Sequence, residues 1–147
     1  MYKHILIPTD GSATAEKGIE AGIAFAREAG ARITFFTAVR EYQPPSESDP
    51  AGRHALSLWD HERISRDKAQ AILQPAAERA RAAGVEAGTA YAQSDHAYEA
   101  IVEAAESRGC DLILMSSHGR DGLAGLWYGS DTRDVLAHSS IPTLVYR

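Results

Sequence analysis

Residues 5–12 read Ile-Leu-Ile-Pro-Thr-Asp-Gly-Ser, an unbroken apolar run followed directly by turn-forming residues. A short apolar run without polar alternation is typical of a strand covered on both faces, as in a parallel sheet. Behind it, Ile19, Ile23 and Ala26 recur at helical spacing until Gly30, which predicts an amphipathic helix. The two segments together predict a strand followed by a helix at the start of an α/β fold.

The same alternation continues to the end of the chain. The predicted strands are 32–39, 85–92, 112–115 and 143–146, and the predicted helices are 55–83, 97–107 and 132–138. Pro75 predicts a kink or break, and Ser130 is the expected cap of the last helix. Residues 40–54 are rich in Pro, Gly and Ser and predict a long loop, either a lid or an insertion. Strict alternation with short connections implies a parallel sheet with helices on both faces.

Composition excludes several classes of protein. The 147 residues fit one domain spanning 1–147, and the net charge of −5 disfavours nucleic acid as a partner. It does not exclude a small phosphate ligand, because backbone N–H groups and a helix terminus can bind an anion in an acidic protein. A single cysteine, Cys110, excludes an intramolecular disulfide and a cysteine-based metal cluster, and is expected to be packed. Without a signal-peptide pattern or an 18-residue apolar run, we expect a cytoplasmic protein with no membrane insertion.

The first candidate site is the loop after the first strand. In an open parallel sheet the ligand crevice lies outside the carboxyl ends of the strands, where the strand order reverses. In the segment Pro8-Thr9-Asp10-Gly11-Ser12, the Asp10 carboxylate could accept hydrogen bonds from a ribose hydroxyl pair, and Gly11 lets a ligand approach the backbone. The alternative is that Asp10 and Ser12 only cap the following helix.

The second candidate site is the loop after strand 112–115. Gly119 is followed by nine residues and then by Gly129 and Ser130, where a helix is expected to begin. The free N–H groups and positive end of such a helix suit phosphate oxygens, and Ser130 could add a hydroxyl donor. The segment is neither a Walker A loop nor a Gly-x-Gly-x-x-Gly motif. The alternative is that the glycines serve only tight turns.

The two loops, together with Ser116-Ser117-His118-Gly119 and the ending Ile141-Pro142-Thr143-Leu144-Val145, make the whole chain similar to the universal stress protein (UspA) family. The resemblance implies an open five-stranded parallel sheet in the order 3-2-1-4-5, a Rossmann-like fold akin to that of the adenine nucleotide α-hydrolases. In the nucleotide-binding branch of that family it also implies ATP bound between strands one and four.

The family's phosphate signature is Gly-x-x-Gly, nine residues, then Gly-Ser or Gly-Thr. Here Gly119, Gly129 and Ser130 match it, but Ser116 stands in place of the first glycine. Serine keeps the backbone N–H but adds a side chain where ribose and phosphates would lie close to the chain. This would reduce affinity, and the alternative is that the small hydroxymethyl group donates a hydrogen bond to the ligand.

The same resemblance assigns the remaining binding residues. The segment Pro8-Thr9-Asp10 falls at the adenine and ribose positions, Val39 packs against adenine, and Met115 holds the corresponding place at the end of strand four. His118 is expected to structure the loop or lie beside adenine rather than transfer a proton. A divalent cation such as Mg²⁺ would accompany the triphosphate, and no protein side chain is assigned as its ligand.

The resemblance predicts a protein that binds ATP or a related adenine nucleotide and has a signalling or stress-response role. No water-positioning residue or charge clamp for phosphoryl transfer can be assigned, so slow ATP hydrolysis is the most that we expect. The alternative within the family is a dimeric interaction module that binds no nucleotide, with Ser116 marking the lost site. A third reading is an enzyme that transfers a nucleotidyl or phosphoryl group, for which the sequence offers no catalytic constellation.

The last predicted strand, residues 143–146, would form an edge of the sheet. An unprotected apolar edge invites pairing, and the resemblance implies a homodimer through it. A protein partner of unknown identity is also expected. Trp59 and Trp127 are candidates for interface positions, and packing beneath the loop is the alternative for Trp127.

Overall fold

The structure is a computed structural model that describes residues 1–41, 58–117 and 129–147. Within these residues the elements are β1 (His4–Pro8), α1 (Ala13–Ala29), β2 (Arg32–Val39), α2 (Leu58–Ala82), β3 (Ala87–Gln93), α3 (Ala97–Ser107), β4 (Leu112–Ser116), α4 (Gly129–His138) and β5 (Thr143–Tyr146). They form one five-stranded sheet in the order β3-β2-β1-β4-β5, and every neighbouring pair is parallel. The predicted fold class and strand order are confirmed.

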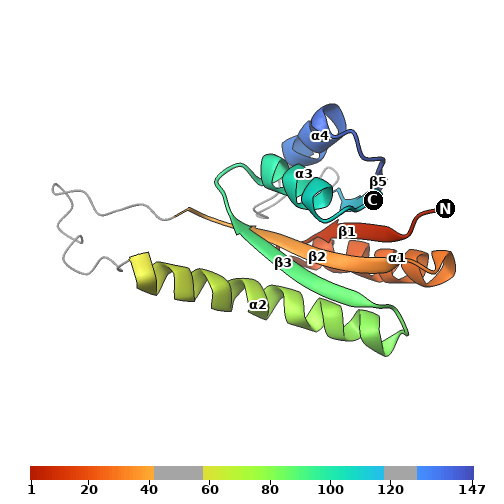
Figure 1. Cartoon of the computed structure of the whole chain (residues 1–147), viewed down its shortest axis with the longest axis horizontal. Coiled ribbons are helices and arrows are strands. Elements are labelled where there is room, and N and C mark those ends of the chain that lie inside the picture. The colour runs from red at the N-terminus through yellow and green to blue at the C-terminus, as the bar shows by residue number, and fades with distance from the viewer. Residues whose placement is uncertain (42–57, 118–128) are drawn as a thin grey trace.

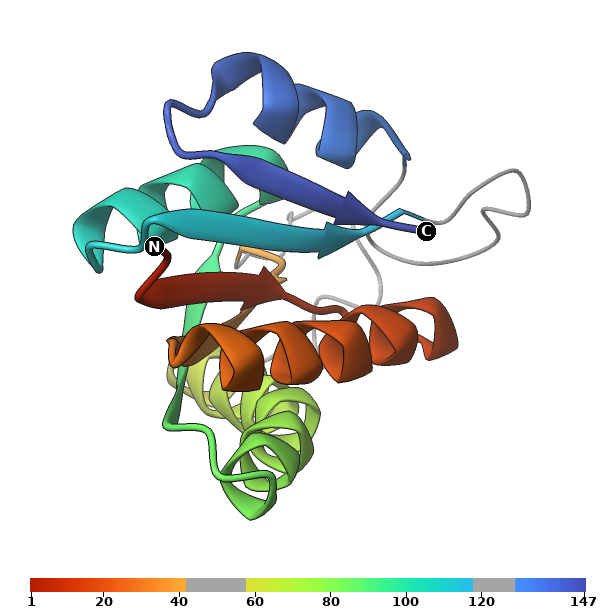
Figure 2. The ribbon, with the colours of Figure 1, turned by 90° about the vertical axis from the view of Figure 1, so that its right-hand side faces the viewer.

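Two helices cover each face of the sheet (Figures 1 and 2). Ile5 and Ile7 of β1 pack in the apolar layer shared with α1 and α2. Leu6, between them, packs in the layer shared with α3 and α4. Because successive side chains of a strand point to opposite faces, a strand covered on both faces needs consecutive apolar residues. Cys110 is buried in the second layer, as predicted, and burial raises the pKa of its thiol to about 11.

The structure corrects two predicted features of the helices. α2 runs from Leu58 to Ala82 as one helix with Pro75 inside it, so the predicted break is absent (Figure 1). Ala69, Leu73 and other apolar side chains of α2 are buried against the sheet, and this burial offsets the hydrogen bond that proline removes. α4 already begins at Gly129, so Ser130 lies in its first turn and not at the cap position, which must precede the first helical residue.

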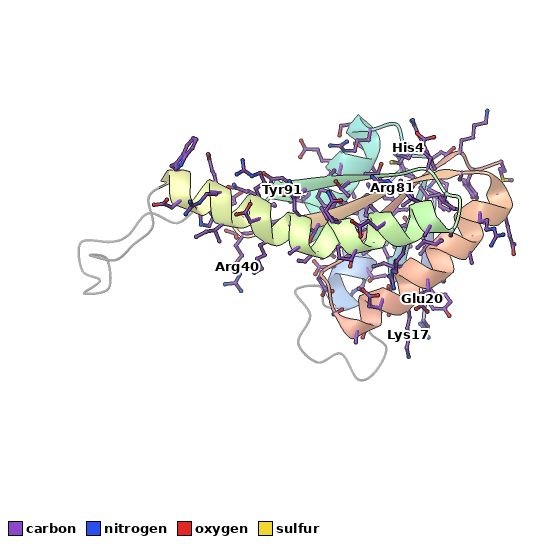
Figure 3. The ribbon with its side chains drawn as sticks, turned by 90° about the horizontal axis from the view of Figure 1, so that it is seen from below. His4, Lys17, Glu20, Arg40, Arg81 and Tyr91 are labelled. Carbon is purple, nitrogen blue, oxygen red and sulfur yellow. The ribbon has the colours of Figure 1, made fainter. Side chains whose placement is uncertain are left out.

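The third strand begins later than predicted, because Val85 lies in the turn after α2 and its N–H bonds back to that helix. Gly84 has φ +81°, and the N–H of Val85 donates to Ala80 O at 2.9 Å, which closes the helix with a left-handed turn. Arg81 then donates from Nε and Nη2 to Ala87 O at 3.2 and 2.9 Å, which ties the end of α2 to the start of β3 (Figure 3). Residues 42–54 of the predicted loop and 55–57 of the predicted helix lie outside the described residues.

The amino-terminal edge of the sheet is held by a buried polar cluster. The Asp111 carboxylate, just before β4, accepts hydrogen bonds from the N–H groups of Lys3 at 2.9 Å and His4 at 3.0 Å. Nε2 of His4 lies 2.7 Å from Oγ1 of Thr34 on β2, so this cluster joins three neighbouring strands. Burial lowers the pKa of His4, and the positive charge of Arg32 lowers it further. Desolvation by itself raises the pKa of Asp111, but the N–H groups of His4 and Lys3 outweigh it and hold that pKa below its usual range.

Replacing Asp111 by alanine should lower the free energy of unfolding by about 1–3 kcal/mol, because the partly buried N–H of His4 and the exposed N–H of Lys3 both lose a charged acceptor. The measurement is urea denaturation at neutral pH. Asp67→Ala is the matched control, since Asp67 is exposed on α2 and makes only a 3.9 Å surface ion pair with Arg66. Equal midpoints for the two variants would contradict the role given to Asp111.

The stability of the protein should also fall as the pH drops below 6.5, the ordinary pKa of histidine. Because the pKa of His4 is lower in the folded protein than in the unfolded chain, the unfolded chain binds the proton more readily, so acid favours unfolding. His4→Gln, which cannot titrate, should flatten this dependence in unfolding curves recorded between about pH 7.5 and pH 5.5. An unchanged pH dependence in that variant would rule out His4 as its source.

Candidate functional site

The candidate site lies at the carboxyl ends of β1 and β4, where the two strands separate. β1 pairs with β2 along its whole length, from His4–Arg32 to Pro8–Phe36. Its pairing with β4 is limited to Ile5–Leu112 and Leu6–Ile113, so the two strands separate beyond these positions. β2 and β4 flank β1 on opposite sides, and an open sheet of parallel strands binds its ligands at such a reversal of strand order.

The loop after β1 is fixed by local hydrogen bonds. The N–H of Thr9 donates to Phe36 O at 2.8 Å, and its buried Oγ1 accepts from the N–H of Gly11 at 3.2 Å. Oδ1 of Asp10 accepts from the N–H of Ser12 at 2.9 Å, and Ser12 itself caps α1 by accepting from the N–H of Ala15. The capping alternative is therefore correct for Ser12, and Asp10 supports that cap with one of its two oxygens.

The second oxygen of Asp10 has no such role. Oδ2 is buried, and none of the described residues offers it a hydrogen-bond partner. A buried polar atom without a partner costs free energy, so its presence at the reversal of strand order favours a ligand that donates a hydrogen bond there. The hydroxyl groups of a ribose are donors of this kind.

The residues predicted to hold adenine lie at two strand ends. Val39 ends β2 and packs in the layer under α1 and α2, whereas Met115 is in β4 and packs under α3 and α4. Their side chains are 6% and 2% exposed and so belong mainly to the core. The structure therefore brings both positions to the carboxyl edge of the sheet, and their contact with a base stays a prediction.

Ser116, the departure from the phosphate signature, lies at the end of β4 with its side chain against α1. A Cβ atom built on Gly18 of α1 would overlap Oγ of Ser116 and lie 3.0 Å from its Cβ. The N–H of the next residue, Ser117, donates to Tyr146 O at 2.8 Å, which continues the β4–β5 ladder. The Ser116 side chain thus points toward Gly18, a position at which α1 has no side chain.

The remaining signature residues are only partly described. His118 and Gly119 lie outside the described residues, whereas Gly129 and Ser130 open α4. The first N–H groups of a helix have no intrahelical acceptor, so the amino end of α4 offers donors where the signature predicts phosphate contacts.

In residues 1–41, 58–117 and 129–147, no three His, Cys, Asp or Glu side chains are grouped so that they could hold a metal ion. In the same residues no helix combines the length and the apolar character needed to span a membrane.

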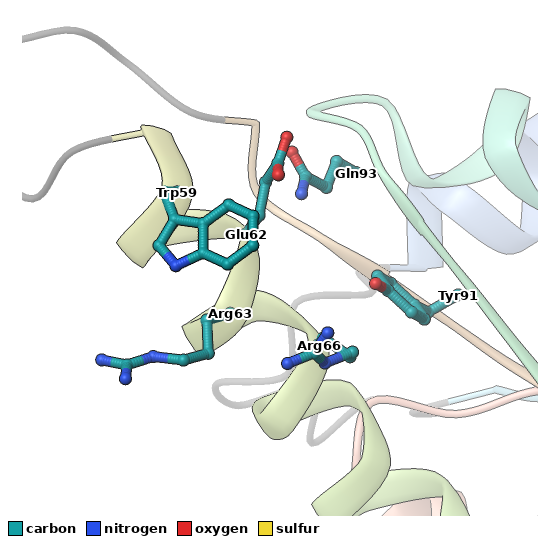
Figure 4. A pocket seen from close by; sticks show the side chains of 6 residues that line it. All are labelled: Trp59, Glu62, Arg63, Arg66, Tyr91 and Gln93. Atoms are coloured by element: carbon teal, nitrogen blue, oxygen red, sulfur yellow. The ribbon is translucent and has the colours of Figure 1, made fainter.

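A groove that the sequence did not predict lies between α2 and β3 (Figure 4). It is lined by Trp59, Arg63 and Arg66 of α2 and by Tyr91 of β3, among others. Trp59 is 76% exposed, which agrees with an interface position for this residue, while Trp127 lies outside the described residues. The signal available in the sequence was an aromatic residue near the start of a predicted helix, but its place in one groove with Tyr91 depends on how α2 packs on β3.

Comparison with known proteins agrees with the fold and the motifs. A sequence model of the universal stress protein family matches residues 1–147. Universal stress protein YxiE of Bacillus subtilis is 30% identical over 149 residues, with 100% of both chains covered.

Solved structures of similar fold include two whose descriptions name a ligand. A universal stress protein in complex with cAMP has a TM-score of 0.71 at 22% identity, covering 99% of this chain and 97% of that one. The universal stress protein of Archaeoglobus fulgidus in complex with dAMP has a TM-score of 0.66 at 19% identity, covering 99% and 98%. At these identities the likeness shows the fold alone. The family match over the full length carries the assignment: the chain belongs to the universal stress protein family.

Proposed function

We propose that this protein, as a single domain over residues 1–147, binds ATP or a related adenine nucleotide in the crevice between β1 and β4. The observation that carries the proposal is the buried, unpartnered Oδ2 of Asp10 at the reversal of strand order. One ribose hydroxyl donating to this oxygen would complete the hydrogen bonding of the loop after β1 without disturbing the Asx turn that Oδ1 makes with Ser12.

The phosphate end of the proposed ligand would meet the amino end of α4. Gly129 and Ser130 begin this helix, so its free N–H groups and positive dipole end face the loop that carries the rest of the signature. Two solved structures of this fold are complexes with dAMP and with cAMP, which are both adenine nucleotides. These observations support an adenine nucleotide as the ligand.

We propose Mg²⁺ as a companion of the triphosphate rather than as a resident ion. Mg²⁺ keeps several waters and commonly takes substrate phosphates as ligands, so it needs no dedicated group of protein carboxylates.

Binding coupled to signalling, and not fast turnover, is the activity we propose. Groups with shifted pKa values often gather at active sites. Four groups in the described residues have a shifted pKa, and three of them lie at the amino-terminal edge of the sheet: His4 in β1, and Cys110 and Asp111 just before β4. The fourth, Tyr98, is on α3, where its hydroxyl donates to the Glu99 carboxylate, which raises its pKa. None of the four is in the loop after β1. We therefore expect at most slow hydrolysis, and a stress-response role in which a protein partner responds to occupancy.

The buried thiol of Cys110 is the only cysteine in the chain and fits a reducing compartment. We propose the cytoplasm as the location.

A thermal-unfolding scan with ATP and Mg²⁺ tests the binding proposal. Ligand at about 100 times its dissociation constant adds roughly 2.7 kcal/mol, which for a domain of this size raises Tm by about 5–11 °C. Asp10→Asn should lose most of this shift, because it keeps an acceptor for Ser12 but replaces the unpartnered oxygen by an amide donor. Asp67→Asn on the exposed face of α2 is the charge-matched control and should keep the shift.

A ligand-side variant sharpens this test. With 2′,3′-dideoxy-ATP, which lacks the hydroxyl donors, the wild-type protein and Asp10→Asn should respond alike. No shift of the wild-type protein at millimolar ATP would remove the proposal and favour the interaction module that binds no nucleotide.

We also propose a homodimer through β5. This strand pairs with β4 along one side, and among the described residues no strand pairs with its other side. Leu144 and Tyr146 on β5 and Leu136 on α4 are exposed, so the free edge carries apolar side chains. Such an edge favours pairing with a second copy.

Light scattering should therefore give twice the chain mass of 15.9 kDa. Leu144→Arg should shift the protein toward monomer, because it places a charge in the interface, whereas Tyr91→Arg on β3, at the opposite edge of the sheet, should not. A wild-type mass of one chain at all concentrations would overturn the dimer.

A further inference from the structure

We infer that Gly18 is a positioning residue for the nucleotide site: by lacking a side chain it seats the hydroxymethyl group of Ser116 against α1 and keeps that group out of the crevice. The inference rests on the proposed function. On this inference, Ser116 does not mark a lost nucleotide site. It is a replacement of glycine that the missing side chain at position 18 compensates.

The first observation is the contact itself. A Cβ atom on Gly18 would overlap Oγ of Ser116 and would lie 3.0 Å from Cβ and 3.5 Å from N of the same residue. Real Cβ atoms do not approach other heavy atoms this closely, so Ser116 occupies the volume that any other residue at position 18 would fill.

The second observation is the direction in which strand β4 points its side chains. Leu112 and Leu114 pack in the layer under α1 and α2, whereas Ile113 and Met115 pack under α3 and α4. Ser116 continues this alternation on the α1 side. Its orientation toward Gly18 is thus set by the pleat of the strand and does not depend on the loop that follows.

The third observation is that α1 runs close to the sheet over a full turn. Gly22, one turn after Gly18, is also buried, and a Cβ there would overlap Cδ1 of Ile7 and lie 3.6 Å from Cδ2 of Leu114. α1 therefore lies close to the sheet on both of these turns, and a side chain at position 18 would require Ser116 or the helix to move.

The consequence concerns the start of the phosphate loop. With its hydroxymethyl group against α1, Ser116 presents to the crevice much the same backbone as the glycine of the signature. An alanine at position 18 would force Ser116 into another of its staggered rotamers, about 120° away, or would push α1 from β4. Either change disturbs the point at which the loop leaves the sheet.

A double-mutant cycle on these two positions tests the inference, with ATP affinity measured by calorimetry well below every unfolding midpoint. Gly18→Ala should weaken ATP binding by roughly tenfold and lower Tm by about 3–8 °C, although alanine in place of glycine normally stabilises a helix. Ser116→Gly alone should leave the affinity within about twofold, because its side chain does not face the ligand. The double variant Gly18→Ala with Ser116→Gly should recover both the affinity and the Tm.

Gly22→Ala is the matched control. An alanine at position 22 would meet Ile7, so this variant should have a lower Tm. Ser116→Gly should not restore that Tm, because Ser116 is not among the nearest contacts of position 22. Rescue of Gly22→Ala by Ser116→Gly would mean a general gain of stability and would overturn the pairing. An affinity that rises more than about fivefold in Ser116→Gly alone would also overturn the inference, because Ser116 would then be an obstruction in the wild-type protein.

Failure of the proposed function is distinguishable from failure of the pairing. If the wild-type protein binds no adenine nucleotide, the site proposal is wrong. The Tm values of the four proteins of the cycle, measured without ligand, still show whether a side chain at position 18 competes with that of Ser116 for the same space. If ATP binds but Gly18→Ala leaves affinity and Tm unchanged, the site stands and the positioning role of Gly18 is wrong.

Discussion

The Ile5, Leu6 and Ile7 side chains of β1 are at most 2% exposed, because α1 and α2 cover one face of the strand and α3 and α4 cover the other. β1 is also paired along both edges, with β2 and with β4. A strand in this position favours apolar side chains along its buried length, so polar functional groups are expected at its two ends. The sheet therefore has two polar regions, an amino-terminal edge where its strands begin and a carboxyl-terminal edge where they end, and we assign different roles to them.

At the amino-terminal edge the polar groups are joined by hydrogen bonds across three strands, and only Nδ1 of His4 is buried there without a partner among the described residues. The Asp111 carboxylate receives two N–H groups from the start of β1, and His4 reaches Thr34 on β2. The pKa shifts of His4 and Asp111 follow from this packing and hydrogen bonding. We therefore relate them to the stability of the fold and not to catalysis. At the carboxyl-terminal edge Oδ2 of Asp10 is buried with no partner among the described residues. This carboxylate oxygen lies at the carboxyl end of β1, where the strand order reverses, and that position is the physical reason to assign ligand binding to the second edge.

The close approach of α1 to β1 and β4 links the fold to the site. Glycines at positions 18 and 22 remove two side chains from the buried face of the helix, and the space is taken by Ser116 on one turn and by Ile7 on the next. The same helix begins at the Ser12 cap, directly after the Asp10 turn. A change in the packing of α1 would therefore move both sides of the proposed crevice together.

The amino-acid sequence by itself determined the local elements: strand 32–39, helix 97–107 and strand 143–146 have the predicted bounds, because apolar periodicity and turn residues report on neighbours along the chain. The strand order came from the family resemblance, since periodicity does not say which strands pair. Tertiary structure alone decided that Pro75 stays within a continuous helix, that Val85 closes α2, that Asp10 keeps one oxygen without a partner and that Ser116 lies against Gly18. Each of these depends on contacts between residues on different elements or on how a helix packs against the sheet, which no local pattern encodes.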